Sequence, residues 1–367
     1  MKICFLGDIS VPGIHLLRWA KQLAELGHEV SVISFETPPP PDPAIKVYHI
    51  TSKVPTKLKY LTSIPIIKKI VKGFNPDLVH AHYVTNYGFI AACLNFRPFI
   101  VSAWGSDVLV NPQKNFFFHL FARFALQKAN LVIIMSEHMR QAVLKLGAQA
   151  QKIVVMPFGV DGTLIEWSKS KNLIHKTDEQ LVIISTRALE PVYNVQLLIQ
   201  AMPSVLQKNP SAQSIIVGKG SEAKKLKEMA GKLGVIRNIH FLGQLSHNEL
   251  LSQMARATLY VSTSLSDGSS ISLHEAMATG LFPACTDIPA NRDWITNGRN
   301  GFLVPTDSPS TLAEKLLEAY QNKKLLDTAR KINWEIVNKY AVLDQNILEA
   351  EKIYQKFISL RSSDRTF

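Results

Sequence analysis

Short apolar runs alternate with amphipathic segments along the whole chain. In the first half, residues 15–26 predict a helix with one apolar face, and buried strands are predicted at 3–6, 30–34, 78–80, 99–102 and 131–135. After a polar stretch at 157–180 the alternation restarts, with strands predicted at 181–185, 214–217, 239–242 and 259–262 and helices at 195–205, 222–233 and 271–279. Strands that alternate with helices indicate parallel sheets covered on both faces.

The length and the polar break predict two domains. A chain of 367 residues exceeds the usual size of one hydrophobic core. We expect a Rossmann-like N-terminal domain at 1–165, a second at 166–344, and a last helix at about 345–367 that packs back on the first domain. Doubly wound sheets bind ligands at the carboxyl ends of their strands, so a ligand is expected in a cleft between the two domains.

The composition is that of a globular, basic protein. Hydrophobic residues make up 46%, which argues against a disordered chain, and no apolar run is long enough to span a membrane. The three cysteines are scattered in apolar segments, so we expect core residues of a cytoplasmic protein. The net charge of +12 is uneven: residues 1–165 carry 17 Lys+Arg and 9 Asp+Glu, hence +8.

Two segments of the first half bear on a contact with membranes. No acidic residue lies between Asp42 and Asp77, where seven lysines occur: Lys46, Lys53, Lys57, Lys59, Lys68, Lys69 and Lys72. Such a patch either attracts polyanions, at the inner face of a membrane for example, or is a solvated surface. Residues 115–129 hold five phenylalanines at helical spacing, which favours a core helix over one that touches lipid.

The stretch 266–305 carries the strongest sign of chemistry. Asp267 is followed by Gly268, Ser269 and Ser270, and then by a predicted helix from Ile271. Small residues before a helix let backbone N–H groups approach a phosphate, and the helix N-terminus favours its negative charge. Glu275 lies about two turns into that helix, where a carboxylate can bind a ribose diol. Each carboxylate alone also fits a cap or a surface position.

Two further elements fit the same ligand. Arg187 comes just after a predicted strand, where its guanidinium can clamp a diphosphate with two hydrogen bonds, although a structural salt bridge is the alternative. The turn at 217–220 brings Gly218 and Lys219 to another strand end. Glycine there lets the backbone approach a base or phosphate, but this turn is weak evidence by itself.

These residues occur in motifs that resemble glycosyltransferase family 4. The matching segments are GHEV at 27–30, PDLVHAH at 76–82, WGSD at 104–107, PFGVD at 157–161, RALEPVYN at 187–194, FLGQ at 241–244, HEAMATG at 274–280 and NGFLVP at 300–305. They follow the order of the family and cover nearly the whole chain. The resemblance implies a GT-B fold, in which two Rossmann-like domains face each other, and transfer with retention of anomeric configuration.

The resemblance also implies roles for individual residues. Arg187 corresponds to the arginine that binds the donor diphosphate, Glu275 to the glutamate that holds the ribose, and Asp267 to an acidic residue that contacts the transferred sugar. Ser269, Ser270 and Ile271 correspond to positions whose backbone amides meet the diphosphate, and Gly7 and Gly13 to a loop that approaches the donor phosphate. Gly218, Gly243 and Gly268 complete the candidate donor contacts.

Three departures from the family pattern stand out. Asp267 replaces a glutamate. Tyr193 stands where a lysine is common, and its phenol can donate a hydrogen bond but cannot neutralise a phosphate, so Lys219 is a candidate for the missing charge. Trp104 replaces a histidine that faces the sugar.

Because Trp104 replaces that histidine, other polar residues become candidates for contacts on the acceptor side. His80 and His82 flank Ala81, and we expect one of them to face the cleft and the other to lie in the core. Asp107 is a further acceptor-side candidate or a cap.

The reaction that these residues predict needs no dedicated nucleophile. Arg187 and backbone dipoles would stabilise the diphosphate leaving group, and Asp267, Glu275 and His82 complete the candidate catalytic set. No D-x-D triplet occurs, so we expect no metal and no cofactor. The expected partners are a nucleotide-sugar donor, a saccharide or lipid-linked cell-envelope acceptor and an anionic membrane, but no nucleic acid. A sugar-nucleotide epimerase and a non-catalytic subunit of the same fold are the alternatives.

Overall fold

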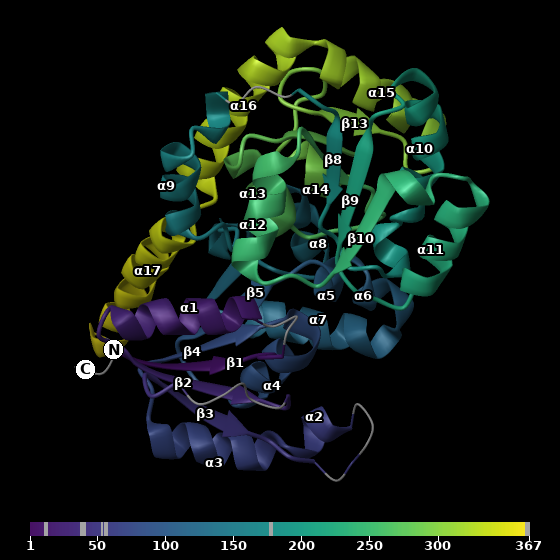
Figure 1. Ribbon diagram of the computed structural model, residues 1–367. Coiled ribbons are helices and arrows are strands. Elements are labelled where there is room, and N and C mark those ends of the chain that lie inside the picture. Colours follow the sequence, from purple (N-terminus) through teal and green to yellow (C-terminus); the bar gives the residue numbers. More distant parts are fainter. Residues whose placement is uncertain (11–13, 37–41, 53, 55–57, 176–178, 364–367) are drawn as a thin grey trace. The chain divides into compact units, whose positions relative to one another are not determined.

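A computed structural model shows two compact units (Figure 1). Unit 1 comprises Met1–Phe158 together with the C-terminal segment from Leu343, and unit 2 comprises Gly159–Val342. The structure describes residues 1–10, 14–36, 42–52, 54, 58–175 and 179–363.

Unit 1 is built on a seven-stranded parallel sheet with the strand order β3-β2-β1-β4-β5-β6-β7. The strands are β1 (Lys2–Leu6), β2 (Glu29–Ser34), β3 (Ile45–His49), β4 (Leu78–His82), β5 (Phe99–Ala103), β6 (Leu131–Ile134) and β7 (Ile153–Val155). The helices are α1 (Ile14–Glu25), α2 (Lys59–Thr62), α3 (Ile64–Phe74), η2 (Val84–Gly88), α4 (Phe89–Cys93), α5 (Ser106–Leu109), α6 (Asn111–Lys114), α7 (Phe116–Lys128), α8 (Arg140–Lys145) and α17 (Leu343–Ser363).

Unit 2 repeats the plan with six parallel strands in the order β10-β9-β8-β11-β12-β13. The strands are β8 (Val182–Ser185), β9 (Gln213–Val217), β10 (Ile239–Gly243), β11 (Leu259–Ser262), β12 (Phe282–Thr286) and β13 (Phe302–Val304). The helices are α9 (Gly162–Ser170), α10 (Gln196–Lys208), α11 (Ala223–Lys232), α12 (His247–Arg256), α13 (Ile271–Ala278), α14 (Pro289–Arg292), α15 (Pro309–Gln321) and α16 (Lys323–Tyr340).

Both strand orders are those of a Rossmann-like fold, so the predicted fold class of two doubly wound parallel sheets is confirmed. The central strands are buried along their length: all five residues of β4, β5 and β12 are inaccessible to solvent. Parallel strands that are covered on both faces are buried along their length, and the apolar run of β5 was visible in the sequence for this reason. In the part of the chain that the structure describes, no helix combines the length and hydropathy needed to cross a bilayer.

The expected boundary at residue 165 falls inside α9. This helix starts after Asp161, whose side chain accepts a hydrogen bond from the Thr163 N–H at 3.1 Å, and it buries Leu164 and Ile165 in the core of unit 2. The units therefore divide at Gly159, some residues earlier than the polar composition indicates.

The C-terminal helix α17 belongs to unit 1, although it follows unit 2 in the chain. Figure 1 shows α17 beside α1, and the two helices are joined by side-chain hydrogen bonds. Trp19 Nε1 of α1 donates to the Tyr354 hydroxyl of α17 at 3.3 Å, and Gln22 Nε2 donates to Asp344 Oδ1 at 2.6 Å.

Candidate functional site

Arg187 and the loop from Asp267 to Ser270, which were both predicted to bind the donor, meet at the ends of two neighbouring strands of the second sheet. β8 ends at Ser185, and the chain continues at once into Arg187. The neighbouring strand β11 ends at Ser262 and leads into the loop that begins α13. The strand order reverses between β8 and β11, and doubly wound sheets bind ligands beyond the carboxyl ends of their strands at this switch point.

The Arg187 guanidinium is buried and fixed by four side chains. Nη2 donates to Asp267 Oδ2 at 2.6 Å, and Nη1 donates to the hydroxyl oxygens of Ser270 at 2.6 Å and Ser272 at 3.0 Å. The ring of Tyr193 stacks against the guanidinium, and the ring centroid lies 4.3 Å from Arg187 Cζ. An arginine held in one conformation loses little entropy when it binds an anion.

The site keeps Arg187 charged. Burial alone would lower the pKa of its guanidinium, but the negative charge of Asp267, with contributions from Tyr260 and Tyr193, outweighs burial and raises this pKa. Two polar atoms of the site are buried without a hydrogen-bond partner in the described part of the chain: Arg187 Nε and Ser269 Oγ. Buried polar atoms are nearly always satisfied by protein, water or ligand, so these two retain hydrogen-bonding capacity at this position.

The loop and the start of α13 supply a second anion-favouring feature. Ser270 is the N-cap residue, and its hydroxyl accepts from the Leu273 N–H at 3.2 Å. The first N–H groups of a helix have no partner within the helix and carry its positive dipole end. Glu275 lies one turn into α13 and is partly exposed. Ile271, at the first position of the helix, is also partly exposed.

Asp267 is engaged by the protein through both carboxylate oxygens. Oδ2 pairs with Arg187, while Oδ1 accepts from the Gly268 N–H at 2.8 Å. The sequence comparison implied a contact between this residue and the transferred sugar. In the structure the carboxylate of Asp267 lies against the guanidinium of Arg187 and orients it.

Tyr193 contacts Arg187 through its aromatic ring. It ends the short helix η6 (Pro191–Tyr193), and its aromatic face stacks on Arg187. A cation over an aromatic face is attracted by the ring quadrupole. The residue that replaces the common lysine therefore supports the arginine and adds no charge of its own.

The glycine turn after β9 packs against the Arg187 loop. Gly218 has φ +144°, and a Cβ placed there would lie 2.4 Å from the Arg187 carbonyl oxygen. Its N–H donates to the Gly243 carbonyl at 2.7 Å, which links the ends of β9 and β10. Lys219 is exposed at this turn, and its carbonyl accepts from the Leu189 N–H at 3.0 Å. Gly218 is thus required for the packing of two loops, a reason that the sequence did not reveal.

His80 and His82 lie on the same face of β4 but differ in their hydrogen bonds. Alternate residues of a strand share one face of the sheet, and the two imidazole centroids of this β4 pair lie 4.3 Å apart. Both side chains are buried. His80 Nδ1 and Nε2 form hydrogen bonds with the hydroxyls of Tyr354 (2.7 Å) and Ser102 (2.8 Å), so His80 is a core residue.

His82 keeps one polar atom without a partner. Trp104 Nε1 donates to His82 Nδ1 at 3.3 Å, so the hydrogen of a neutral His82 lies on Nε2. This Nε2 is buried and has no partner in the described residues. Burial lowers the pKa of His82 to about 3, which keeps the imidazole neutral, and lowers the pKa of His80 well below its ordinary value.

Asp107 holds the loop after β5. Its buried carboxylate accepts from the N–H groups of Val84, Trp104 and Gly105 at 2.7–3.0 Å. Burial raises the pKa of Asp107 to about 6, although these hydrogen bonds act in the opposite direction. Asp107 therefore fixes the conformation of this loop.

Gly7 lies at the end of β1, at the switch point of the first sheet. A Cβ there would lie 2.4 Å from Leu16 Cδ2 and 3.3 Å from His82 Cβ, so glycine allows α1 to pack closely over the strand. The other predicted glycine of this loop, Gly13, lies outside the described residues.

Sequence reasoning missed several residues that shape the two sites. Ser272 binds Arg187 and accepts from the Tyr260 hydroxyl at 3.1 Å. The serine-rich run at 269–272 was a usable signal for Ser272, whereas Tyr260 looks like any other residue of an apolar strand. Phe158 contacts the rings of His82 and Trp104, with centroids 6.2 Å and 5.1 Å away. Over the described residues, no three His, Cys, Asp or Glu side chains gather as metal ligands would.

Comparisons with known proteins agree with this geometry. Residues 2–136 match the family model "Glycosyl transferase 4-like", and residues 167–333 match "Glycosyl transferases group 1". Phosphatidyl-myo-inositol mannosyltransferase of Mycobacterium tuberculosis is 26% identical over 358 residues, which cover 90% of this chain and 92% of the relative.

Two solved structures share the fold. Sucrose-phosphate synthase from Thermosynechococcus elongatus superimposes with a TM-score of 0.82 at 14% identity, covering 98% of this chain and all of the other. Anabaena HepE in complex with UDP and glucose superimposes with a TM-score of 0.78 at 20% identity, covering 97% and 99%. The chain therefore belongs to the glycosyltransferases with group 1 and 4-like domains, of the GT-B type.

Proposed function

We propose that this glycosyltransferase transfers a hexose-type sugar from a nucleotide diphosphate sugar with retention of anomeric configuration. The observation that supports the proposal most is the fixed, charged Arg187 at the switch point, beside the N-terminus of α13. Both features favour a diphosphate, and the unpartnered Arg187 Nε and Ser269 Oγ leave hydrogen-bonding capacity for it.

In this proposal the protein stabilises the leaving group. As the bond between the anomeric carbon and the diphosphate breaks, negative charge grows on the phosphate oxygens, and Arg187 and the α13 N–H groups are already oriented toward such charge. The acceptor hydroxyl attacks from the same face and gives its proton to the departing phosphate. Glu275 would hold the ribose, and Lys219 is placed at a turn from which its flexible side chain could add a positive charge.

The reaction is proposed to need no metal ion. The chain contains no D-x-D triplet to bridge a metal and a diphosphate, and Arg187 with the helix N-terminus offers an alternative means of charge stabilisation.

The acceptor is proposed to be a saccharide or a lipid-linked molecule of the cell envelope, bound by unit 1. The mycobacterial relative is named for a phosphatidyl-myo-inositol acceptor, which supports a lipid-linked one. The neutral His82, with its unpartnered Nε2, is the candidate hydrogen-bond donor to a sugar hydroxyl.

Donor turnover tests the function. The protein is incubated with UDP-, GDP- and ADP-sugars in the presence of a metal chelator, and mass spectrometry follows release of the nucleoside diphosphate. We expect slow hydrolysis of one donor without acceptor, with loss of turnover in Glu275→Ala. NMR of the released or transferred sugar should show the anomeric configuration of the donor. Conversion of the donor to an epimer, or no consumption of any donor, would contradict the proposal.

A further inference from the structure

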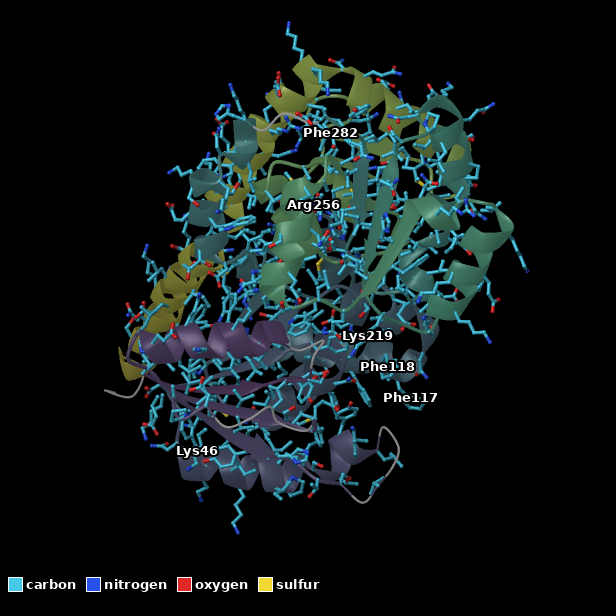
Figure 2. The ribbon with its side chains drawn as sticks, in the orientation of Figure 1. Lys46, Phe117, Phe118, Lys219, Arg256 and Phe282 are labelled. Atoms are coloured by element: carbon cyan, nitrogen blue, oxygen red, sulfur yellow. The ribbon has the colours of Figure 1, made fainter. Side chains whose placement is uncertain are left out.

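Helix α7 of unit 1 exposes an apolar stripe to solvent. Phe116 is 70% exposed, Phe117 64%, Leu120 41% and Phe124 36%. The phenylalanines of this segment were predicted to lie mostly in the core, and that prediction is wrong for these three. The helix is anchored by its opposite face, where Ala122, Ala125 and Leu126 are buried. Figure 2 labels Phe117 and Phe118 at the N-terminal end of the helix.

The stripe is continuous on the helix surface. At about 100° per residue, Phe116, Leu120, Phe124 and Phe117 follow one another within roughly a third of the helix circumference. Scattered single apolar side chains are normal on protein surfaces, whereas four adjacent large ones on one helix face mark an interaction site.

Cations border the stripe on both sides. By the same helical spacing, Arg123 lies next to Phe116 at one edge and Lys128 lies next to Phe117 at the other. Both side chains are exposed, and Lys128 Nζ lies 5.9 Å from the centroid of the Phe124 ring. Lys114, also exposed, precedes the helix.

No acidic residue occurs in the sequence between Asp107 and Glu137. The face therefore combines exposed aromatic side chains with unbalanced positive charge. A second copy of this chain would bring the same cations to a symmetric contact and no carboxylate from this segment. An anionic lipid surface supplies both an apolar layer for the rings and negative headgroups for the cations.

We propose that the face formed by Phe116, Phe117, Leu120 and Phe124, bordered by Arg123 and Lys128, docks unit 1 onto an anionic lipid bilayer. Helix α7 would lie in the plane of the interface, with its rings among the acyl chains near the headgroups and its two cations at the phosphates. This inference concerns where the enzyme works, and it holds independently of the proposed donor and reaction.

Vesicle sedimentation tests the proposal with the full-length chain and no sugar nucleotide. The vesicles are phosphatidylcholine alone or phosphatidylcholine mixed with phosphatidylglycerol. We expect binding to the anionic vesicles that weakens with added salt. The Phe117→Ser/Leu120→Ser variant should bind roughly tenfold more weakly or worse. Arg123→Gln/Lys128→Gln should bind about 30-fold more weakly.

Matched variants in unit 2 serve as controls. Leu233→Ser/Ile236→Ser removes two apolar side chains of similar exposure, 41% and 43%, and Lys324→Gln/Lys331→Gln removes two exposed cations. Both controls should bind vesicles as the wild type does. Thermal unfolding of each variant is measured in parallel and should match the wild type, because the replaced side chains are exposed.

Equal vesicle binding by the α7 variants and the controls would overturn the proposal, as would equal binding to neutral and anionic vesicles. Light scattering after size-exclusion chromatography tests whether a second copy of the chain covers this face instead of lipid. A dimer that dissociates in Phe117→Ser/Leu120→Ser, without any binding to vesicles, would assign the face to a second copy of the chain and would also overturn it.

Discussion

At the scale of single residues, Arg187 shows how a buried cation is made useful. A charged side chain in a dry environment needs a partner, and Asp267 provides one at 2.6 Å. The serines at 270 and 272 accept two further hydrogen bonds from Nη1, and the ring of Tyr193 covers one face of the guanidinium. The guanidinium is thereby fixed before any ligand arrives, which is the property that a site for a developing anion requires.

The stacking of Tyr193 on Arg187 predicts a difference between two substitutions. Tyr193→Phe retains the aromatic face and should leave nucleoside diphosphate affinity within about twofold of the wild type, whereas Tyr193→Ala should weaken it about threefold to tenfold. Isothermal titration of both variants measures the effect. If Tyr193→Phe and Tyr193→Ala weakened nucleoside diphosphate binding equally, the hydroxyl rather than the ring would be responsible for the effect. The interpretation of Tyr193 as a support for Arg187 would then be wrong.

His274 in α13 predicts a pH dependence of stability. Both of its ring nitrogens are buried without a partner in the described residues, and burial lowers its pKa to about 3 from an ordinary value of 6.5. A depressed pKa in the folded state gives stability that is present above pH 6.5 and is lost as the pH falls toward 3. Between pH 7.5 and pH 4.5 this residue should cost about 3 kcal/mol of unfolding free energy.

His274→Leu removes the titrating group at similar volume. Its unfolding free energy should therefore fall by about 3 kcal/mol less than that of the wild type between the two pH values. Urea denaturation at pH 7.5 and pH 4.5 provides the comparison. An unchanged pH dependence in the variant would show that His274 is not the buried neutral group described here.

At the scale of elements, a tight contact between two loops of unit 2 holds the Arg187 loop in place. Gly218→Ala would place a Cβ against the Arg187 carbonyl oxygen at φ +144°. We expect a loss of about 2–3 kcal/mol in unfolding free energy and weaker diphosphate binding, because the Arg187 loop must move.

Gly234→Ala is the matched control for Gly218→Ala. Gly234 also has positive φ, +71°, but nothing lies within 4 Å of its Cβ position, so the substitution should cost only about 1 kcal/mol and spare binding. Denaturation and titration of the two variants separate contact from backbone strain. Equal losses in both would contradict the loop-packing explanation.

The elements that could be predicted were those with a strong local signal. Strands β1, β5, β6, β8 and β11 lie in mostly apolar runs, and α10, α11 and α13 show helical spacing between breakers. β7 and β13 have only three residues each and were missed, as was β3, which is partly exposed. β12 was also missed although it is fully buried, because its segment FPACT contains a proline and ends in a polar residue. The burial of α7 was predicted wrongly because periodicity reveals that a helix has an apolar face but not which face its neighbours cover.

The candidate site was predicted in part for the same reason. Arg187 and the loop from Asp267 to Ser270 lie 80 residues apart, and motif order, not local pattern, connected them. The ion pair between Arg187 and Asp267 depends on the directions of their side chains after the strand ends, and local sequence patterns do not reveal these directions. Likewise, the shared face of His80 and His82 follows from the extent of β4, which reaches His82 rather than ending at His80.

At the scale of the whole molecule, the chain forms two doubly wound units, and its last helix packs against the first of them. Unit 2 carries the fixed arginine and the helix N-terminus, and unit 1 carries the buried imidazole of His82 and the exposed face of α7. The returning helix α17 is part of the core of unit 1, because the Tyr354 hydroxyl bonds both Trp19 and His80.

The central claim is that unit 2 binds a nucleoside diphosphate through Arg187, and calorimetric titration with UDP, GDP and ADP tests it most directly. We predict that one of these binds the wild type and that Arg187→Ala loses about tenfold to a hundredfold in affinity. Arg256→Ala, which removes an exposed arginine of the same unit, should bind as the wild type does. No binding of any diphosphate, or equal affinity in both variants, would contradict the account.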